Sequence, residues 1–335
     1  YFGVKYAIAT NSCTAALHLA LDAIGATEGD EIITSALTFV STAHSIVLNG
    51  AKPVFADVDP ETFNINPIDV EGKITPRTKA ILAVHYGGHP CQMRELMEIA
   101  KRHNILLIDD AAHACGAEYD GSKIGNGKLS HMTCFSFHAV KNLSTADGGM
   151  VTTDNEEFAK RIKRMNWVGI NKDTYERNNK GYSWDYDVTE FGFKYHMNDV
   201  NAAIGLVQLR KLEKMNERRR EIVQRYNQEF RYLDWLETPK SKGLIKNSFH
   251  HYRIMVKNGK RNALHEHLKN LKISSSVHYK PVYLHTVYQS NPYYRGICLN
   301  VTEEVWKSCL LLPLYPDMTE QDIERVINGV KNFVV

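Results

Sequence analysis

Residues 133–153 read Thr-Cys-Phe-Ser-Phe-His-Ala-Val-Lys-Asn-Leu-Ser-Thr-Ala-Asp-Gly-Gly-Met-Val-Thr-Thr. Two short apolar runs of strand-forming residues, 134–137 and 150–153, enclose a polar stretch that has Lys141 at its centre. The pair Gly148-Gly149 precedes the second run, where the backbone must turn or approach another segment closely. The pattern predicts a strand–lysine–strand hairpin, which places an amine at the mouth of a core.

An amine in that position loses hydration, so its pKa falls and it can form a Schiff base with a carbonyl compound. The alternative interpretation of Lys141 is a surface charge, which is what most lysines are. The sequence on either side of Lys141 is the evidence that separates the two.

Phe-Ser-Phe-His-Ala-Val-Lys-Asn-Leu followed by Asp-Gly-Gly resembles the cofactor-lysine segment of the DegT/DnrJ/EryC1/StrS family of sugar-nucleotide aminotransferases. These are pyridoxal-phosphate (PLP) enzymes of the aspartate-aminotransferase fold. The family usually has Gly-Glu-Gly-Gly where this chain has Ala146-Asp147-Gly148-Gly149, a change that keeps the charge and removes one glycine. The resemblance implies that Lys141 holds PLP and is catalytic.

Composition is that of a globular protein with a large core: 335 residues, 43% apolar, 24% charged, and a net charge of +3. The longest basic run is Arg218-Arg219-Arg220, which is too short to indicate nucleic-acid binding. The sequence contains no stretch of ~18 consecutive apolar residues, so it predicts no membrane span. The six cysteines show no Cys-x-x-Cys spacing and indicate reduced thiols in a cytoplasmic protein. The chain opens at Tyr1, and the resemblance implies that an N-terminal segment is missing before it.

Strand and helix patterns alternate over the first ~150 residues, which predicts a mostly parallel, doubly wound sheet. Predicted strands are 6–9, 31–34, 52–57, 80–84 and 105–108, and predicted helices are 41–48, 93–103, 156–165 and 199 to about 231. From residue 236 we expect a smaller α/β unit, with strands 250–256 and 273–277 and helices 264–271 and 319–330. Thr319-Glu320-Gln321-Asp322, a variant of the capping box, opens the last of these helices. The prediction is therefore an α/β protein with a large domain, 1–235, and a small C-terminal domain, 236–335; the resemblance implies PLP-dependent transferase fold type I.

The stretch Thr10-Asn11-Ser12-Cys13-Thr14 precedes a helical pattern, so it forms the N-terminus of a predicted helix. Hydroxyls and backbone N–H groups at a helix N-terminus suit an anion, although a simple N-cap is the alternative. The family carries Ser-Gly-Thr here, around the PLP phosphate. The resemblance therefore implies cofactor binding by Ser12, Cys13 and Thr14, with the Cβ of Cys13 crowding the phosphate.

Asp109-Asp110-Ala111-Ala112-His113 follows the strand predicted at 105–108. A carboxylate at the end of a buried strand is costly unless a cation meets it, and a protonated pyridine nitrogen is such a cation. The alternative is an aspartate that caps a helix. The family pattern Asp-x-Ala-Gln matches residues 110–113, which implies that Asp110 is the pyridine partner, that Asp109 turns away, and that His113 lies near the 3′-oxygen of the cofactor.

The resemblance assigns further contacts. Phe39 is expected to stack on the pyridine ring, rather than to be a core aromatic, and Ser136 to bind the phosphate with Ser12 and Thr14. His278-Tyr279-Lys280-Pro281 matches the family's His-Tyr-x-Pro loop, so substrate contacts are expected from His138, His278 and Tyr279.

Lys194 stands in Gly192-Phe193-Lys194-Tyr195-His196, where most of the family has Asn. The family residue reaches the phosphate of the neighbouring subunit's cofactor, which implies a homodimer with shared active sites; a surface lysine is the alternative. A metal site is not predicted, because none of the five histidines considered pairs at ligand spacing with a cysteine or carboxylate: His85, His89, His113, His131 and His138.

The function implied is transfer of an amino group from an amino acid, L-glutamate in most of the family, to a keto-sugar nucleotide, with C4 the expected position. Residues 169–177 are most similar to the branch that includes the UDP-4-amino-4-deoxy-arabinose synthase, which indicates surface-polysaccharide, lipopolysaccharide or related amino-sugar biosynthesis. One alternative is a PLP-dependent sugar dehydratase, which carries His at the position of Lys141; another is a non-catalytic regulatory relative. A nicotinamide enzyme lacks support, because no Gly-x-Gly-x-x-Gly follows an early strand.

Overall fold

The computed structural model describes residues 1–170, 186–241 and 243–334. Its centre is a seven-stranded sheet of order β1-β9-β8-β5-β4-β2-β3. The strands are β1 (Tyr6–Thr10), β2 (Glu31–Ser35), β3 (Lys52–Ala56), β4 (Thr78–Val84), β5 (Leu106–Asp110), β8 (Met132–Ser136) and β9 (Gly149–Thr153). From β3 to β8 all neighbours are parallel, while β9 runs antiparallel to β8 and β1. The predicted mostly parallel sheet is confirmed.

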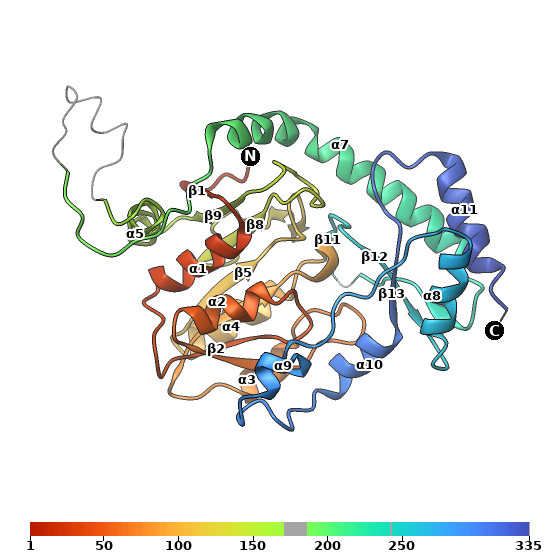
Figure 1. The fold of residues 1–335 in the computed structure, drawn as a ribbon, viewed down its shortest axis with the longest axis horizontal. Helices are drawn as coiled ribbons and strands as arrows, with labels where there is room; N and C mark the ends of the chain where they lie inside the picture. The colour runs from red at the N-terminus through yellow and green to blue at the C-terminus, as the bar shows by residue number, and fades with distance from the viewer. Residues whose placement is uncertain (171–185, 242, 335) are drawn as a thin grey trace.

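Both faces of this sheet are covered, as Figure 1 shows. One face packs on α1 (Cys13–Ala23), α2 (Ser41–Leu48) and α5 (Glu156–Asn166), and the other on α3 (Pro67–Gly72) and α4 (Met93–Arg102). Successive strand residues point to opposite faces, so Leu107 joins one core and Ile108 the other. Strands buried on both sides need apolar residues at every position, which explains the continuous apolar runs in the sequence.

The C-terminal part has its own three-stranded antiparallel sheet, order β10 (Leu236–Glu237), β12 (Tyr252–Val256), β13 (Cys309–Leu312). Around it lie α8 (Arg261–Asn270), α10 (Asn300–Ser308) and α11 (Glu320–Lys331). The 3-10 turn η2 (Val282–Leu284) and α9 (Thr286–Gln289) instead pack against Phe55 of β3. Thr319 and Asp322 form the capping box predicted at the start of α11. A small sheet of β11 (Ile245–Lys246), β6 (Glu118–Tyr119) and β7 (Ser122–Lys123) joins this part to the rest.

The strand predicted at 273–277 is wrong. Only Ser276 makes a β-bridge there, to Leu311, and the second long strand of this part is β13 instead. Three consecutive serines, Ser274, Ser275 and Ser276, offer little apolar surface, and Ser275 Oγ lies 2.7 Å from His265 Nδ1. The segment therefore satisfies its polar groups through side chains rather than through a ladder.

Helix α7 (Asp199–Phe230) runs from the large sheet to α11, along one side of the molecule (Figure 1). Its second half is buried and contributes Ile222, Val223, Tyr226 and Phe230 to the core of the small sheet. Its first half exposes Val200, Ile204, Leu206 and Val207. The division into domains at residue 235 stays a prediction. Among the described residues, no helix is both long and apolar enough to cross a membrane.

Candidate active site

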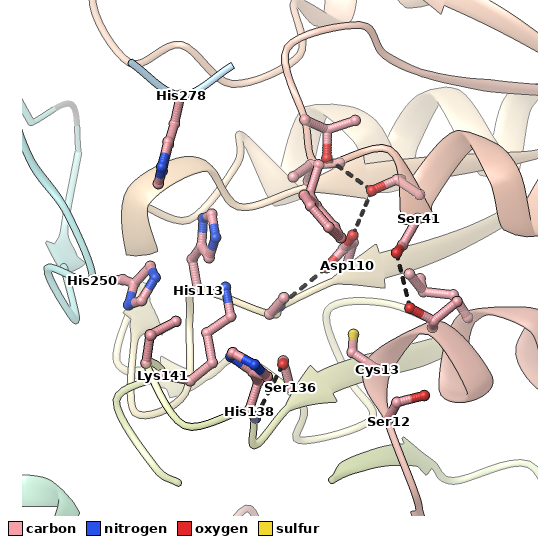
Figure 2. A pocket seen from close by; sticks show the side chains of 18 of the residues that line it. Ser12, Cys13, Ser41, Asp110, His113, Ser136, His138, Lys141, His250 and His278 are labelled. Carbon is pink, nitrogen blue, oxygen red and sulfur yellow. Dashed lines mark hydrogen bonds between the residues drawn. The ribbon is translucent and has the colours of Figure 1, made fainter. Parts of the chain in front are cut away.

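A cavity of about 350 Å³ opens at the C-terminal ends of β4, β5 and β8. Ligands of open α/β sheets bind at this edge, and the volume is within the range of small-molecule sites. Every predicted site residue except Lys194 lines it: Ser12, Cys13, Thr14, Phe39, Asp110, His113, Ser136, His138, Lys141, His278 and Tyr279. Figure 2 shows Lys141 and three histidines on one side of the cavity and Ser12, Cys13 and Ser41 on the other.

Lys141 lies in the connection between β8 and β9, whose antiparallel pairing of Ser136 with Gly149 confirms the predicted hairpin. The Lys141 amide donates a 2.9 Å hydrogen bond to the His138 carbonyl, which closes a turn and directs the side chain inward. Burial lowers the pKa of the Lys141 amine, and the negative forms of Cys13 and Asp110 oppose that shift in part. An amine with a lowered pKa is the nucleophilic form of lysine.

The side chain of Asn142, the residue after Lys141, makes three hydrogen-bond contacts. Its Nδ2 donates to Asn216 Oδ1 (2.7 Å) and to the Ser248 carbonyl (2.8 Å), and its Oδ1 lies 3.0 Å from His250 Nδ1. These partners come from α7 and from the segment before β12, so the lysine loop is fixed to both parts of the chain.

Asp110 and Asp109 face opposite ways. Asp110 Oδ2 accepts a 2.8 Å hydrogen bond from Thr42 Oγ1, and its Oδ1 accepts one of 3.1 Å from the Ala112 amide, which leaves the carboxylate in the cavity wall. Asp109 Oδ2 instead accepts from Ser130 Oγ at 2.6 Å. Burial raises the pKa of Asp110, whereas its two hydrogen bonds and the charge of Lys141 lower it. A buried carboxylate of this kind is stabilised by a cation placed in the cavity.

The N-terminus of α1 forms the opposite wall. Ser12 is the N-cap and accepts a 3.1 Å hydrogen bond from the Ala15 amide, while Thr14 Oγ1 donates to Ser41 Oγ at 2.8 Å. A side chain at Gly149 would place its Cβ 2.5 Å from the Ser12 carbonyl carbon and 2.6 Å from the Cys13 nitrogen. The close approach predicted at Gly148-Gly149 is therefore made by Gly149, against this N-terminus.

The family model described as "DegT/DnrJ/EryC1/StrS aminotransferase family" matches residues 1–331. The chain belongs to this family. It is 46% identical over its whole length to an uncharacterized protein of Methanocaldococcus jannaschii, MJ1066, and 42% identical to the spore coat polysaccharide biosynthesis protein SpsC of Bacillus subtilis; it covers 87% of each. Its fold superposes with a TM-score of 0.91 on the sugar aminotransferase Spr1654 of Streptococcus pneumoniae in its PMP form, at 30% identity, covering 99% of this chain and 88% of that one.

Enzymes of this family are PLP-dependent aminotransferases, and so is this protein. The residues in the cavity fit the cofactor: an amine at Lys141, a buried carboxylate at Asp110 for a pyridine nitrogen, and hydroxyls at the α1 N-terminus for a phosphate. When bound, PLP supplies an electron sink for negative charge on a substrate carbon. Cys13, which stands at the glycine position of the family motif, lies in this wall of the cavity.

The prediction from sequence missed several residues of the site, among them Thr42, Asn142, His250 and His251. Thr42 and Asn142 form hydrogen bonds with residues that are distant in the sequence, and no local sequence pattern predicts such contacts. The His250-His251 pair is a polar interruption before β12, and this feature of the sequence is the signal from which the pair could have been found.

Lys194 lies outside the cavity of its own chain. Its Nζ lies 3.1 Å from the centroid of the Trp167 ring, and its backbone pairs with Trp167 in a β-bridge. The family segment 169–177 lies outside the described residues from 171 onward.

Proposed function

We propose that this protein transfers the amino group of L-glutamate to C4 of a keto-sugar nucleotide, in the synthesis of an amino sugar for a surface polysaccharide, lipopolysaccharide or related glycan. The observation that carries the proposal is the joint presence of Lys141 and Asp110 in the wall of one cavity, on either side of the space for PLP. The name of the relative SpsC, a spore coat polysaccharide biosynthesis protein, supports the product class. Residues 169–177 support the branch that aminates C4.

In this proposal Lys141 holds the cofactor through Nζ and, once released by the amino donor, accepts and returns a proton at the reacting carbon. Its lowered pKa suits an amine that must be neutral to take up that proton. Asp110 keeps the pyridine nitrogen protonated, and Thr42 holds the carboxylate in place. Ser12, Thr14 and Ser136 bind the phosphate together with the backbone at Cys13, Phe39 stacks on the ring, and His113 contacts the 3′-oxygen.

His138, His278 and Tyr279 complete the proposed substrate side. Tyr279 OH lies 3.2 Å from His113 Nε2, so the loop that carries it reaches the cavity floor from the C-terminal part. The dehydratase alternative requires a histidine in place of Lys141, and a non-catalytic relative would not need Lys141 and Asp110 together. Neither has an observation in its favour.

We further propose a homodimer with shared sites. The first half of α7 exposes Val200, Ile204, Leu206 and Val207, and Phe191 is fully exposed nearby in sequence. Apolar surface of this extent on one helix indicates a partner. Lys194 precedes this helix, and its Nζ lies over the Trp167 ring rather than in the lining of its own cavity, so a neighbouring subunit's phosphate is its proposed target.

The function is tested by incubating the purified protein with PLP, L-glutamate and a panel of 3-keto and 4-keto sugar nucleotides, and identifying amino sugars by mass spectrometry. Lys141→Ala should abolish turnover and remove the visible absorption band that borohydride bleaches in the wild type. Lys160→Ala, on the exposed face of α5, is the matched control and should behave as wild type. Turnover by Lys141→Ala at the wild-type rate would contradict the proposal. A cytoplasmic location is likewise proposed and is tested by cell fractionation.

A further inference from the structure

Three imidazoles from two distant parts of the sequence meet in one wall of the cavity. His113 follows β5, whereas His250 and His251 precede β12. Their ring centroids form a nearly equilateral triangle, with sides of 4.4 Å (His113–His250), 4.6 Å (His113–His251) and 4.3 Å (His250–His251). One nitrogen from each ring lies within 4.8 Å of the others. Figure 2 shows His113 and His250 facing each other beside Lys141.

The tautomer of His250 is set by its neighbour Asn142. Because Asn142 Nδ2 donates to Asn216 Oδ1 and to the Ser248 carbonyl, the oxygen of this amide must be the atom that faces His250 Nδ1, at 3.0 Å. An amide oxygen only accepts, so His250 Nδ1 carries the proton and Nε2 keeps its lone pair. Metal-binding histidines are oriented in the same way, with the second ring nitrogen donating to an oxygen acceptor.

His251 offers a second nitrogen. Its Nε2 lies 3.2 Å from His278 Nδ1, while its Nδ1 is buried and has no hydrogen-bond partner within the described part of the chain. An unpartnered buried nitrogen is costly and is stabilised by any group that binds it. His113 is the third: its Nε2 contacts Tyr279 OH at 3.2 Å and its Nδ1 accepts from the Gly87 amide at 3.3 Å, a long hydrogen bond that a ligand can displace.

We propose that His113, His250 and His251 form a site for a divalent transition-metal ion such as Zn²⁺, and that an ion bound there inhibits the enzyme. Three imidazoles with an open fourth position are a frequent ligand set for zinc, with Zn–N bonds of about 2.0–2.1 Å. Such bonds place the nitrogens about 3.3 Å apart, so the rings close by small side-chain rotations from their present separation. Imidazole also suits Cu²⁺, Ni²⁺ and Co²⁺.

Inhibition is expected because the ion would lie in the cavity that holds Lys141, and this half of the proposal rests on the proposed function. The three histidines line the same cavity as Lys141, His278 and Tyr279. An ion there attracts the lone pair of the Lys141 amine. It also draws His113 away from the Gly87 amide and so shifts the ring that Tyr279 contacts, which disturbs the substrate loop. Sequence spacing alone predicted no metal site, because the three ligands come together only when β5 and β12 are brought to one cavity.

Binding is tested on the PLP-loaded protein by isothermal titration calorimetry with ZnCl₂. Wild type should bind one equivalent with micromolar or tighter affinity, and His250→Gln and His251→Gln should each bind at least tenfold more weakly. His265→Gln is the matched control, because His265 lies on α8 against Ser275 and outside the cavity. X-ray absorption at the zinc edge of the wild type should show three imidazole ligands, a result that does not depend on how well any variant folds.

Affinity in the millimolar range for wild type, wild-type affinity in both cluster variants, or a zinc shell without imidazole nitrogen would overturn the site. Zn²⁺ should also stop turnover reversibly, with activity restored by EDTA. Full turnover with zinc bound to the three histidines would overturn the inhibitory half. If no sugar nucleotide is aminated at all, the proposed function fails, whereas the calorimetric and absorption results still decide the metal site.

Discussion

Thr42 Oγ1 donates a hydrogen bond of 2.8 Å to Asp110 Oδ2, from the first turn of α2 to the end of β5. This contact selects one of two adjacent carboxylates for the cavity. Asp109, one residue earlier on the strand, points to the opposite face and accepts from Ser130 and Thr133. The two neighbours are therefore expected to respond differently to the same substitution.

Asp110→Asn should lower kcat by about 10²–10³-fold with little change in folding, because it removes the charge that keeps the pyridine nitrogen protonated. Asp109→Asn should instead lower the free energy of unfolding by about 1–3 kcal/mol, since it disturbs buried hydrogen bonds away from the cavity. Steady-state kinetics and urea unfolding of both variants check this. A dead Asp109→Asn enzyme beside a near-normal Asp110→Asn enzyme would reverse the assignment.

Gly149→Ala should weaken PLP binding and lower stability. Its Cβ would meet the backbone of Ser12 and Cys13 at 2.5–2.6 Å, so the α1 N-terminus that is proposed to hold the phosphate has to move. Overpacking of this kind costs about 1–3 kcal/mol. Gly72→Ala is the control, because its Cβ would meet nothing within 4 Å. Equilibrium dialysis of PLP and thermal unfolding provide the measurements, and unchanged PLP affinity in Gly149→Ala would count against this phosphate site.

Lys141→Ala and Lys194→Glu should each be inactive and should regain activity when mixed, if Lys194 serves the neighbouring subunit. A heterodimer of the two would contain one site damaged twice and one intact site. With free exchange half of the dimers are mixed, so about a quarter of wild-type activity should return.

Activity is measured after exchange, and native mass spectrometry of differently tagged subunits reports whether mixed dimers formed. Mixed dimers without regained activity would show that Lys194 acts within its own subunit or away from the phosphate. A protein that sediments only as a monomer at micromolar concentration would remove the premise.

Stability should fall at acid pH partly through Glu31, at the start of β2. Burial raises the pKa of this carboxyl, but hydrogen bonds from Thr75 (2.6 Å), Arg77 (2.8 Å) and Lys52 (3.1 Å) outweigh burial and lower it from 4.5 to about 2. A pKa below the unfolded value stabilises the fold above pH 4.5, and the contribution is lost as the pH falls toward 2.

Glu31→Gln, which mimics the protonated form, should cost about 3 kcal/mol at pH 7, and the difference from wild type should shrink by about 2 kcal/mol at pH 3. Urea unfolding at the two pH values measures it. The exposed pair of Glu156 with Lys160 is the comparison, where Glu156→Gln should change stability by less than about 0.5 kcal/mol. A pH-independent difference for Glu31→Gln would show that the carboxyl is not ionised in the folded protein.

The sequence by itself determined the features that depend on neighbouring residues. The apolar runs and helical patterns predicted the strand–lysine–strand hairpin, the mostly parallel sheet and the bounds of α2, and Thr319 with Asp322 predicted the start of α11. These signals are local, because side-chain direction and capping are set within a few residues. The failed strand at 273–277 marks the limit: its apolar ends suggested a strand, while Ser275 found a side-chain partner on α8.

Only the tertiary structure decided which distant groups meet. Thr42 contacts Asp110, Asn142 is held by Asn216 and Ser248, and His113 meets the pair His250-His251, in each case across more than 60 positions of the sequence. The structure likewise placed Lys194 on Trp167 rather than in its own cavity. Such contacts follow from the register of β5 and from the docking of β12 and α7 against the large sheet. Packing over the whole chain determines that register and docking, so no local pattern in the sequence predicts the contacts.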